Sequence, residues 1–483
     1  MQIGNGGTIG TLSTAAVTNN ATLRFNRSNT LTQGTDFGTI GGSGDLTQSG
    51  AGTTVLNAAN TYTGTTNVNA GTLTAAGGAA VPDAGVVIVN TNGTFNVTGN
   101  ETVGSVAGSG DLTLANGVTL THGGNNASTT FSGDITGGGA LTKQGAGTTT
   151  LGGLNTYTGA TNVYNGAIRV ASIASNTGTN NTISLGSGAG VGTLVYTGTG
   201  EVSPKSIYQS AGAAANGGTL DMSGTGALRF TGATLAANAS QQHTLTLQGS
   251  TTGIGQIDGV ISDGSATNKT SLLKQGTGTW VLAGANTYTG ITTVIAGTLR
   301  ATPAAYNNLL TNAGGIVLGN TGGVLELDYT TTSPASLIDS ILTAGYPSFT
   351  AGRIRAAAAL AAGQAIGYAD DASEVTVRVT LGGDADLDGD VDFNDFLALQ
   401  AHFGTAGNFG NGDFNYDHIV DFNDFLLMQT NFGQALAAGA TADVTAEQVA
   451  AMTAFGNAIR VPEPTSLALL GSGGLMLTRR RRC

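Results

Sequence analysis

The sequence has 483 residues, of which only 10% are charged, and its net charge at neutral pH is −12. An acidic chain without a basic stripe cannot neutralise phosphates, which argues against nucleic acid as a partner. The single cysteine is the last residue, Cys483, so no internal disulfide can form, and repeat proteins bury enough area by stacking to do without one.

The first part of the chain, residues 1–339, alternates short apolar runs with Gly- and Asn-rich turns. One longer sequence occurs three times in it, at residues 46–75, 141–171 and 272–301, each time with the pentapeptide Asn-Thr-Tyr-Thr-Gly. Alternation at period two predicts strands, the Asn and Gly clusters predict turns, and self-similarity predicts stacked repeats. The fold class is therefore predicted to be mainly β, with residues 1–339 forming a β-solenoid.

Further single rungs of the solenoid are predicted between the copies, where Val, Leu and Ile alternate with Thr and Asn. They are residues 21–26, 85–90, 192–198, 226–232 and 323–329. The apolar side chains should point inward, and Gly should turn the corners. The Tyr of each pentapeptide is predicted to form a structural corner, and the Asn before it a stacked amide ladder.

Several side chains of the repeats have two interpretations. Lys143 and Lys274 share a repeat position that Gln48 fills in the first copy, and we predict that they lie at the surface and aid solubility. Trp280 replaces Thr or Val of the sister copies. Partial burial in the core is favoured for Trp280, with carbohydrate stacking as the alternative.

No catalytic residue is predicted. Solenoid enzymes that act on polysaccharides need two or three acids or bases on one face. Glu326 and Asp328 would share a strand face, and Asp258 lies near Asp263 in the sequence. A solvated surface is the favoured interpretation of both pairs. His122 and His243 have no partners at ligand spacing.

The three copies, with their common frame LTKxGxGTxxLxGxNTYTG, resemble the autotransporter-associated β-strand repeat, also called the passenger-associated transport repeat. The resemblance implies a right-handed parallel β-helix displayed outside the cell as a surface stalk. Residues 340–382 follow as a predicted β-rich cap or connector. Short helices are expected within residues 340–345 and 356–369, and a strand at residues 373–381.

Residues 383–434 hold two acidic segments offset by 29 residues, with ten Asp and no Lys or Arg between Asp384 and Asp424. Their spacing is that of a twelve-residue calcium loop, in which alternate oxygens converge on a hard cation and position 7 offers its carbonyl. Gly389 supplies the sharp turn at position 6 of the first loop, and His418, which tolerates positive φ, replaces it in the second. A merely solvated acidic surface is the alternative.

Two calcium ions are thus the predicted cofactors. The predicted ligands of the first loop are Asp384, Asp386, Asp388, Asp390, Asp392 and Asp395, and those of the second are Asp413, Asn415, Asp417, Ile419, Asp421 and Asp424. One helix is predicted to leave each loop, at residues 396–403 and 425–432, and none to enter. This arrangement resembles a type I dockerin. The resemblance implies that positions 10 and 11 of each loop face a cohesin-like partner, namely Phe393, Asn394, Phe422 and Asn423.

An Ala-rich linker and an amphipathic helix are predicted over residues 435–460, with Thr445 and Gln448 as a capping box. Residues 461–483 join Pro-Glu-Pro to a short apolar run and an Arg block. As a helix, the run of residues 465–478 would span roughly 21 Å, short of the ~30 Å hydrocarbon core, so it predicts a weak, transient inner-membrane anchor. The Arg block would hold that end in the cytoplasm.

This tail resembles the PEP-CTERM sorting signal, which implies recognition and removal by an exosortase after export. The sorting residues are Pro462, Glu463, Pro464, Arg479, Arg480, Arg481 and Arg482. The whole chain resembles a planctomycete-type surface protein. It is predicted to be an exported, non-enzymatic structural or adhesive protein of the cell surface or extracellular matrix. The rival hypothesis is a dockerin-tethered component that binds or degrades an extracellular polysaccharide. Since the sequence starts in mid-rung without a leader, it is expected to be a fragment.

Overall fold

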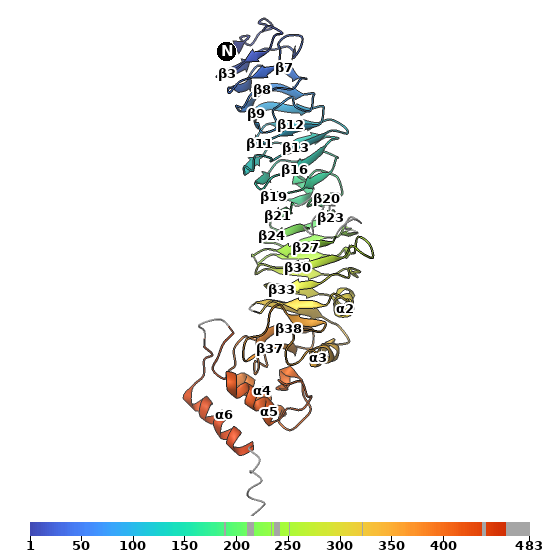
Figure 1. Cartoon of the computed structure of the whole chain (residues 1–483), viewed down its shortest axis with the longest axis vertical. Helices are drawn as coiled ribbons and strands as arrows, with labels where there is room; N and C mark the ends of the chain where they lie inside the picture. Colours follow the sequence, from blue (N-terminus) through green and yellow to red (C-terminus); the bar gives the residue numbers. More distant parts are fainter. Residues whose placement is uncertain are drawn as a thin grey trace, which may run out of the picture.

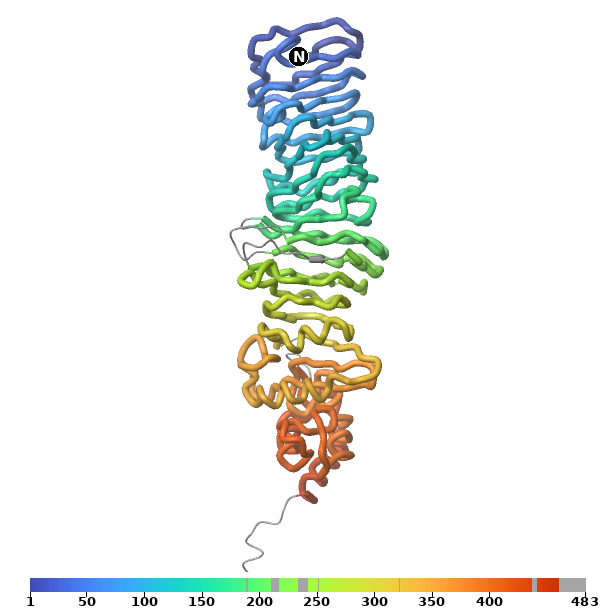
Figure 2. Tube along the Cα trace, turned by 90° about the vertical axis from the view of Figure 1, so that its right-hand side faces the viewer, coloured from blue at the N-terminus to red at the C-terminus, as the bar shows by residue number. Residues whose placement is uncertain are grey.

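The computed structural model describes residues 1–187, 190–209, 217–232, 234–235, 242–250, 252–320, 322–436 and 441–459. They form a right-handed parallel β-solenoid of about 13 turns, with a group of helices at its C-terminal end (Figure 1). The turns stack along one axis (Figure 2). The predicted mainly β solenoid is confirmed.

Strands at equivalent positions of successive turns pair in parallel ladders. The longest ladder contains β1 (Gln2–Ile3), β3 (Thr22–Phe25), β6 (Asp45–Gln48), β8 (Thr66–Ala75), β9 (Val86–Val97), β11 (Ser105–Gly108), β14 (Thr129–Phe131), β17 (Thr148–Leu151), β19 (Gly166–Val170), β21 (Gly192–Tyr196), β24 (Gly218–Met222), β27 (His243–Gln248), β30 (Thr270–Lys274), β32 (Thr292–Val294), β34 (Ile316–Leu318) and β36 (Ile354–Ala356). A second ladder joins β4 (Leu31–Thr32), β7 (Thr53–Leu56), β12 (Asp111–Leu114) and β15 (Ile135–Gly137) through β8 and β9.

Two further ladders complete the walls of the column. One contains β10 (Glu101–Val103), β13 (Thr119–His122), β16 (Ala140–Lys143), β18 (Thr161–Val163), β20 (Thr182–Leu185) and β23 (Ser206–Gln209). The other contains β22 (Glu201–Ser203), β25 (Leu228–Phe230), β28 (Ile254–Ile257), β31 (Thr279–Leu282), β33 (Gly297–Ala301) and β35 (Gly323–Asp328). Short pairs join β2 (Val17–Thr18) to β5 (Ile40–Gly41) and β26 (Thr234–Leu235) to β29 (Val260–Ile261). Helices α1 (Ile173–Asn176) and α2 (Pro303–Thr311) lie in the turns.

The core follows from the alternation of the sequence. Along β27 and β35 every second side chain is buried, because successive residues of a strand point to opposite faces. Parallel pairing then stacks equal side chains, such as Leu245 of β27 on Leu272 of β30. All five predicted single rungs contain a strand, namely β3, β9, β21, β25 and β35.

The Tyr of each pentapeptide is a structural corner, as predicted. Tyr62, Tyr157 and Tyr288 are fully buried. The hydroxyl of Tyr157 lies 2.6 Å from that of Thr161, and the other copies repeat this contact. The predicted amide ladder is wrong, because each Asn bonds to the main chain of the preceding turn instead. The side-chain oxygen of Asn155, Oδ1, accepts from the Ile135 N–H at 2.9 Å, and the other two copies have the same bond.

One Gly of each repeat is required by a close approach of neighbouring turns. Gly166 has a φ of 66°, and a Cβ there would lie 2.4 Å from the Gly145 carbonyl oxygen. Its counterparts in the other copies have the same conformation and the same crowding. Only Gly fits such a left-handed, crowded position.

The two repeated lysines are buried, which corrects the prediction that they lie at the surface. Lys143 and Lys274 are 0% exposed, and each ammonium donates to main-chain carbonyls at the arc that follows its strand. In the first copy the Gln48 amide donates to the Gly50 and Gly52 carbonyls, 2.8 and 3.1 Å away. This repeat position therefore holds a side-chain donor that bonds to the main-chain carbonyls after the strand. Trp280 is buried, as favoured, and its indole N–H donates to the Gln248 carbonyl at 2.9 Å.

The C-terminal end of the solenoid is closed by reversed strands. α3 (Ala335–Thr343), β37 (Gln364–Asp370) and β38 (Glu374–Leu381) follow the last turns, and β38 pairs antiparallel with both β35 and β37. The predicted strand at residues 373–381 is confirmed, and residues 340–343 are helical. A helix within 356–369 is wrong: residues 364–369 belong to β37, where the hydrogen bonds of the sheet outweigh the helix propensity of Ala.

Candidate metal centre

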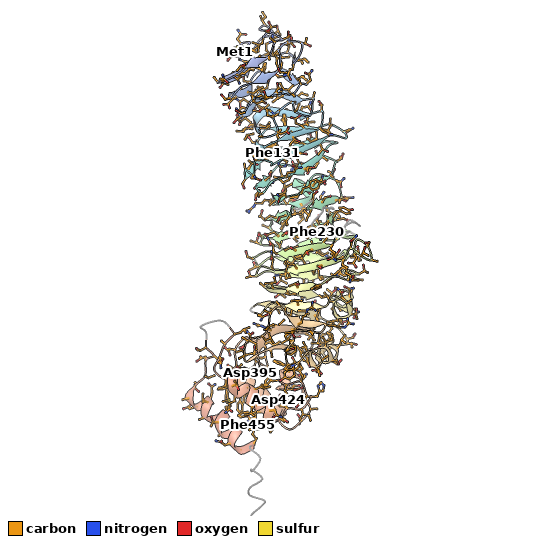
Figure 3. The ribbon with its side chains drawn as sticks, in the orientation of Figure 1. Met1, Phe131, Phe230, Asp395, Asp424 and Phe455 are labelled. Carbon is orange, nitrogen blue, oxygen red and sulfur yellow. The ribbon has the colours of Figure 1, made fainter. Side chains whose placement is uncertain are left out.

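Both acidic loops lie in the helical module at the end of the column, where Figure 3 labels Asp395 and Asp424. Each loop leads directly into one helix. These helices are α4 (Phe393–His402) and α5 (Phe422–Asn431), which overlap the predicted ranges. Within the described chain the first loop follows β38, and the second follows the single 3-10 turn η1 (Phe409–Asn411).

The last acid of each loop also caps the helix that leaves it. Asp395 accepts from the Asp392 N–H at 2.8 Å and, through its other oxygen, from the Ala385 N–H at 2.7 Å. Asp424 makes the same pair of bonds in the second loop. Asp392 and Asp421 are the N-caps, so each helix begins with a capping box. These bonds tie the end of each loop to its beginning.

The fold brings the predicted ligands together in three groups, and within each group one oxygen per residue lies within 4.8 Å of the others. The groups are Asp384, Asp386 and Asp388; Asp390, Asp392 and Asp395; and Asp413, Asp417 and Asp424. Asp421 lies in the second loop but outside its group, and the Asn415 side chain accepts from the Asp417 N–H at 2.8 Å. The side chain of Ile419 is exposed, and only its carbonyl would serve as a ligand.

A buried oxygen without a partner shows that the first loop fits a cation. Asp384 is 0% exposed, and its Oδ2 accepts from Gly389 N–H at 3.1 Å and from the Thr380 hydroxyl. Its Oδ1 is buried and has no hydrogen-bond partner among the described residues. An unpaired buried carboxylate is costly unless a cation or a proton neutralises it. All-oxygen ligands at this spacing suit calcium.

The loop backbone bends at two positions. Gly389 and His418, at position 6, have φ values of 104° and 70°, so the prediction that His418 tolerates positive φ is confirmed. Leu387 and Tyr416, at position 4, also have positive φ, of 62° and 61°. Sequence analysis missed position 4. An apolar or aromatic residue stands at this position in both loops, but positions 2, 8 and 10 share that property, so the sequence does not single position 4 out.

The loops hold protons near neutral pH because their carboxyl groups are buried beside one another. Burial raises the pKa of Asp384 to about 7, that of Asp395 to about 8 and that of Asp424 to about 6, and neighbouring carboxylates add to the rise in each case. A bound divalent cation would supply the positive charge that lets these groups ionise. The same acids would therefore exchange their protons for a metal if one bound.

The four predicted docking residues lie at the starts of α4 and α5. Asn394 and Asn423 are exposed, whereas the Phe393 and Phe422 side chains are half-buried. The Phe393 ring lies 5.5 Å from that of Phe396, and the Phe422 ring is stacked on Phe425. The Asn pair is therefore accessible to a partner, and the Phe pair only in part.

A further helix, α6 (Ala446–Ile459), covers one side of the pair α4 and α5. The Phe455 ring of α6 lies 5.2–5.7 Å from the rings of Phe396, Phe403 and Phe425. The predicted capping box of α6 is confirmed, since Thr445 and Gln448 exchange hydrogen bonds of 2.7 and 3.3 Å. The sequence predicted this helix, but not that it covers the aromatic rings of the module.

The first pair of solenoid acids, Glu326 and Asp328, lies beside Arg300 at the end of the column. Asp328 is bonded to Arg300 at 2.7 Å, and Arg300 also binds Glu374 at 2.8 Å and lies 4.0 Å from Glu326. Burial, with the nearby Glu374 carboxylate, raises the pKa of Glu326 to about 7. These residues form a charge cluster between the last parallel turn and β38.

The second pair of solenoid acids is divided between different partners. Asp258 binds Arg229 at 2.5 Å, whereas Asp263 accepts from the Thr270 and Thr289 N–H groups. His122 is buried, and its ring nitrogens have no hydrogen-bond partner in the described structure.

The sorting residues, Pro462 to Pro464 and Arg479 to Arg482, lie outside the described residues. Within the part of the chain that is described, no helix is both long and apolar enough to cross a membrane. The sorting and anchoring functions stay predictions.

Comparison with known proteins adds to the geometry. Residues 46–75, 141–170 and 272–301 match the family described as PATR: Passenger-associated-transport-repeat. Over 146 residues the chain is 33% identical to the Adhesin BmaC autotransporter of Brucella suis biovar 1 (strain 1330), and this match covers 28% of the chain but 4% of the adhesin. No solved structure matches the chain. The chain is thus a β-solenoid protein that carries three autotransporter-associated repeats.

Proposed function

We propose that this chain is an exported protein of the cell surface or extracellular matrix, in which the solenoid forms an adhesive stalk and the helical module docks to a partner. The match of its repeats to the passenger-associated transport repeat and the similarity of 28% of the chain to an adhesin autotransporter carry the surface role. The described solenoid supports a structural rather than an enzymatic function, because its acids are separated or bound to Arg. Detection of the protein on intact cells by protease shaving tests the location. Resistance to shaving, with release only on lysis, would contradict it.

We further propose that each acidic loop binds one calcium ion. The buried, unpartnered Oδ1 of Asp384 is the observation that carries this proposal. Asp386, Asp388, Asp390, Asp392 and Asp395 complete the first ligand set, and Asp413, Asn415, Asp417, Ile419, Asp421 and Asp424 form the second. Calcium would neutralise carboxylates that otherwise repel each other, and so would stabilise the start of α4 and of α5.

Calorimetry of the full chain with calcium chloride tests the sites. Two ions should bind, and helix content should rise on addition. Asp384→Asn and Asp413→Asn should each remove one binding event, because each substitution takes away one charged ligand. Asn423→Ala, which changes an exposed side chain outside the ligand sets, is the control. Absence of binding at millimolar calcium would refute the sites.

With both loops loaded, α4 and α5 would present Asn394 and Asn423, with Phe393 and Phe422 beside them, to a cohesin-like protein. The offset of 29 residues gives both helices the same docking pair. The C-terminal tail would pass through the membrane transiently and be removed by an exosortase. Mass spectrometry of the secreted protein tests the removal: a mature form that still contains Pro462 to Arg482 would contradict it.

A polysaccharide-binding role is the second candidate, and one surface feature favours it. A shallow groove of about 300 Å³ crosses successive turns of the solenoid and is lined by Asp221, Gln248 and Gln275. Their side chains form a row of hydrogen bonds, each 2.7 Å long, which resembles the polar lining that sugar hydroxyls need. Gln248→Ala should abolish retention on glycan columns if this groove binds polysaccharide. A depolymerising activity that Glu326→Gln removes would favour the degradative form of this role.

A further inference from the structure

We propose that calcium fastens the helical module to the end of the solenoid, so that the direction of the module relative to the column is fixed only when the loops are loaded. This inference rests on the proposed calcium sites and adds a task to them. It follows from the residues that lie between the ligands, which contact β37, β38 and α3 of the column as well as Phe409 of the module.

In the second loop, Tyr416 reaches from position 4 into the end of the column. It is 3% exposed, and its hydroxyl donates to the Ile366 carbonyl in β37. Its ring lies 5.8 Å from that of Tyr346 and 6.0 Å from that of Phe349, both of which belong to the solenoid cap. The Tyr416 side chain is thus buried between the loop and the end of the column.

Position 6 of the same loop makes a polar contact with the column. His418 Nδ1 lies 3.3 Å from Asp339 Oδ2 of α3, and Asp339 also accepts from the Tyr368 hydroxyl at 2.8 Å. Positions 4 and 6 alternate with the ligand positions 3, 5 and 7. One short stretch of backbone therefore faces the metal site and the solenoid in turn.

The first loop repeats this arrangement. Leu387, again at position 4, is 6% exposed, and its carbonyl accepts from Arg378 of β38 at 2.9 Å. Gly367 of β37 lets the loop approach, since a Cβ there would lie 2.7 Å from the Leu387 side chain and 2.5 Å from the Phe409 ring. The ligand Asp384 is itself bonded to Thr380 of β38. Both loops thus contact the column through the residue at position 4.

The interface is incompletely filled on the side of α5. A cleft of about 210 Å³ lies between Tyr346, Pro347 and Gln364 of the cap and Phe414 and Leu427 of the module. The Asn431 side chain at the end of α5 bridges this side by donating to the Gly363 and Gly382 carbonyls. Attachment elsewhere rests on the two loops and on η1, which packs against β37.

Calcium and attachment are coupled through the backbone of position 4. In each loop the ligands at positions 3 and 5 flank position 4, which is Leu387 or Tyr416. An ion bound to the two ligands would therefore fix the left-handed backbone of the residue that contacts the column. Without the ion, the carboxylates that remain ionised repel one another, which favours an open loop and releases Tyr416 from the column. Linkage then requires that attachment strengthens calcium binding by the same factor.

Distance measurement by pulsed spin-label spectroscopy tests the fastening on the full chain. Cys483→Ser removes the native thiol, and labels are placed by Asn307→Cys on α2 and Gln429→Cys on α5, both exposed. One narrow distance distribution is expected in calcium chloride and a broad one in chelator. Calorimetry with calcium alone is run in parallel on the same protein.

A substitution in the solenoid cap tests the coupling between calcium binding and attachment. Phe349→Ala removes a ring that contacts Tyr416 but lies outside the loops, and it should broaden the distribution in calcium and weaken calcium binding about fivefold or more. Phe230→Ala, which removes an equally buried ring far along the column, is the matched control and should do neither. If Phe349→Ala does not fold, Tyr416→Phe, which loses only the bond to Ile366, carries the same test.

The outcomes separate the two proposals. Two bound ions with an unchanged distribution would overturn the fastening and leave the calcium sites standing. Equal calcium affinities for the Phe349→Ala and Phe230→Ala proteins would also overturn it. A chain that binds no calcium would refute both.

Discussion

The buried lysine of the third repeat makes the most direct prediction about the solenoid. The Lys274 ammonium donates to the carbonyls of Gln275, Gly276 and Ala296 at 3.1, 2.7 and 2.8 Å, and it forms no ion pair with an acid among the described residues. Burial lowers its pKa to about 8, so it stays charged at neutral pH. The carbonyl at Ala296 belongs to the next turn, and the lysine therefore joins two turns.

Lys274→Ala removes three charge-assisted bonds, and it leaves their carbonyls unpaired and the space of the stem empty. Each such bond contributes about 1.5–3 kcal/mol, but partial relaxation of the arc recovers some of this. We expect a loss of about 4 kcal/mol in the free energy of unfolding, because these bonds and the packing of the lysine stem are lost together. Lys274→Gln should cost only about 1 kcal/mol, because Gln48 serves the same arc in the first copy.

Urea unfolding followed by circular dichroism at the β-sheet band measures this difference. Lys269→Ala, at a half-exposed lysine just ahead of the same strand, is the control and should change stability little. Equal stability of the Lys274→Ala and Lys269→Ala proteins would show that the carbonyl arc does not depend on the ammonium. A Gln variant as unstable as the Ala variant would refute the equivalence of the two repeats.

Two predictions concern the helical module. Because burial raises the pKa of Asp395 to about 8, the folded module in chelator binds protons that the unfolded chain releases above about pH 4. The melting temperature of the protein in chelator should therefore be highest in acid and fall as the pH rises toward 8. Calcium affinity should rise over the same pH range. A melting temperature in chelator that rises with pH would contradict this. Phe455→Ala removes the ring that covers Phe396, Phe403 and Phe425, so α6 should detach, with a loss of about 2 kcal/mol and new binding of a hydrophobic dye. Dye binding no greater than that of the parent protein would show that α6 does not cover these rings.

Most of the column could be predicted because the sequence patterns that determine it lie within short stretches of the chain. Alternation at period two places Leu245 and Leu282 inward wherever the strand pairs, and the repeated pentapeptide marks the corners. The acidic loops were equally local, since the proposed ligand positions lie within twelve consecutive residues. Parallel rungs and acidic loops therefore appeared in the sequence before any long-range contact was known.

The failures share a different cause. Whether Lys143 is exposed depends on the carbonyls of Gly145 and Asn165, which the fold gathers from two turns. The roles of Leu387 and Tyr416 depend in the same way on β37, which comes earlier in the chain but reaches them only after folding. A propensity argument also fails for residues 364–369, because the partner strand β38 decides their conformation.

The reversal at β38 has a consequence for assembly. A stack of parallel rungs can in principle grow by accepting the same strand direction from another molecule, as amyloid-like edges do. Here the strand laid on β35 runs the opposite way, and β37 beyond it contacts α3 and η1. Growth of a filament by parallel strand addition to β35 is thereby obstructed.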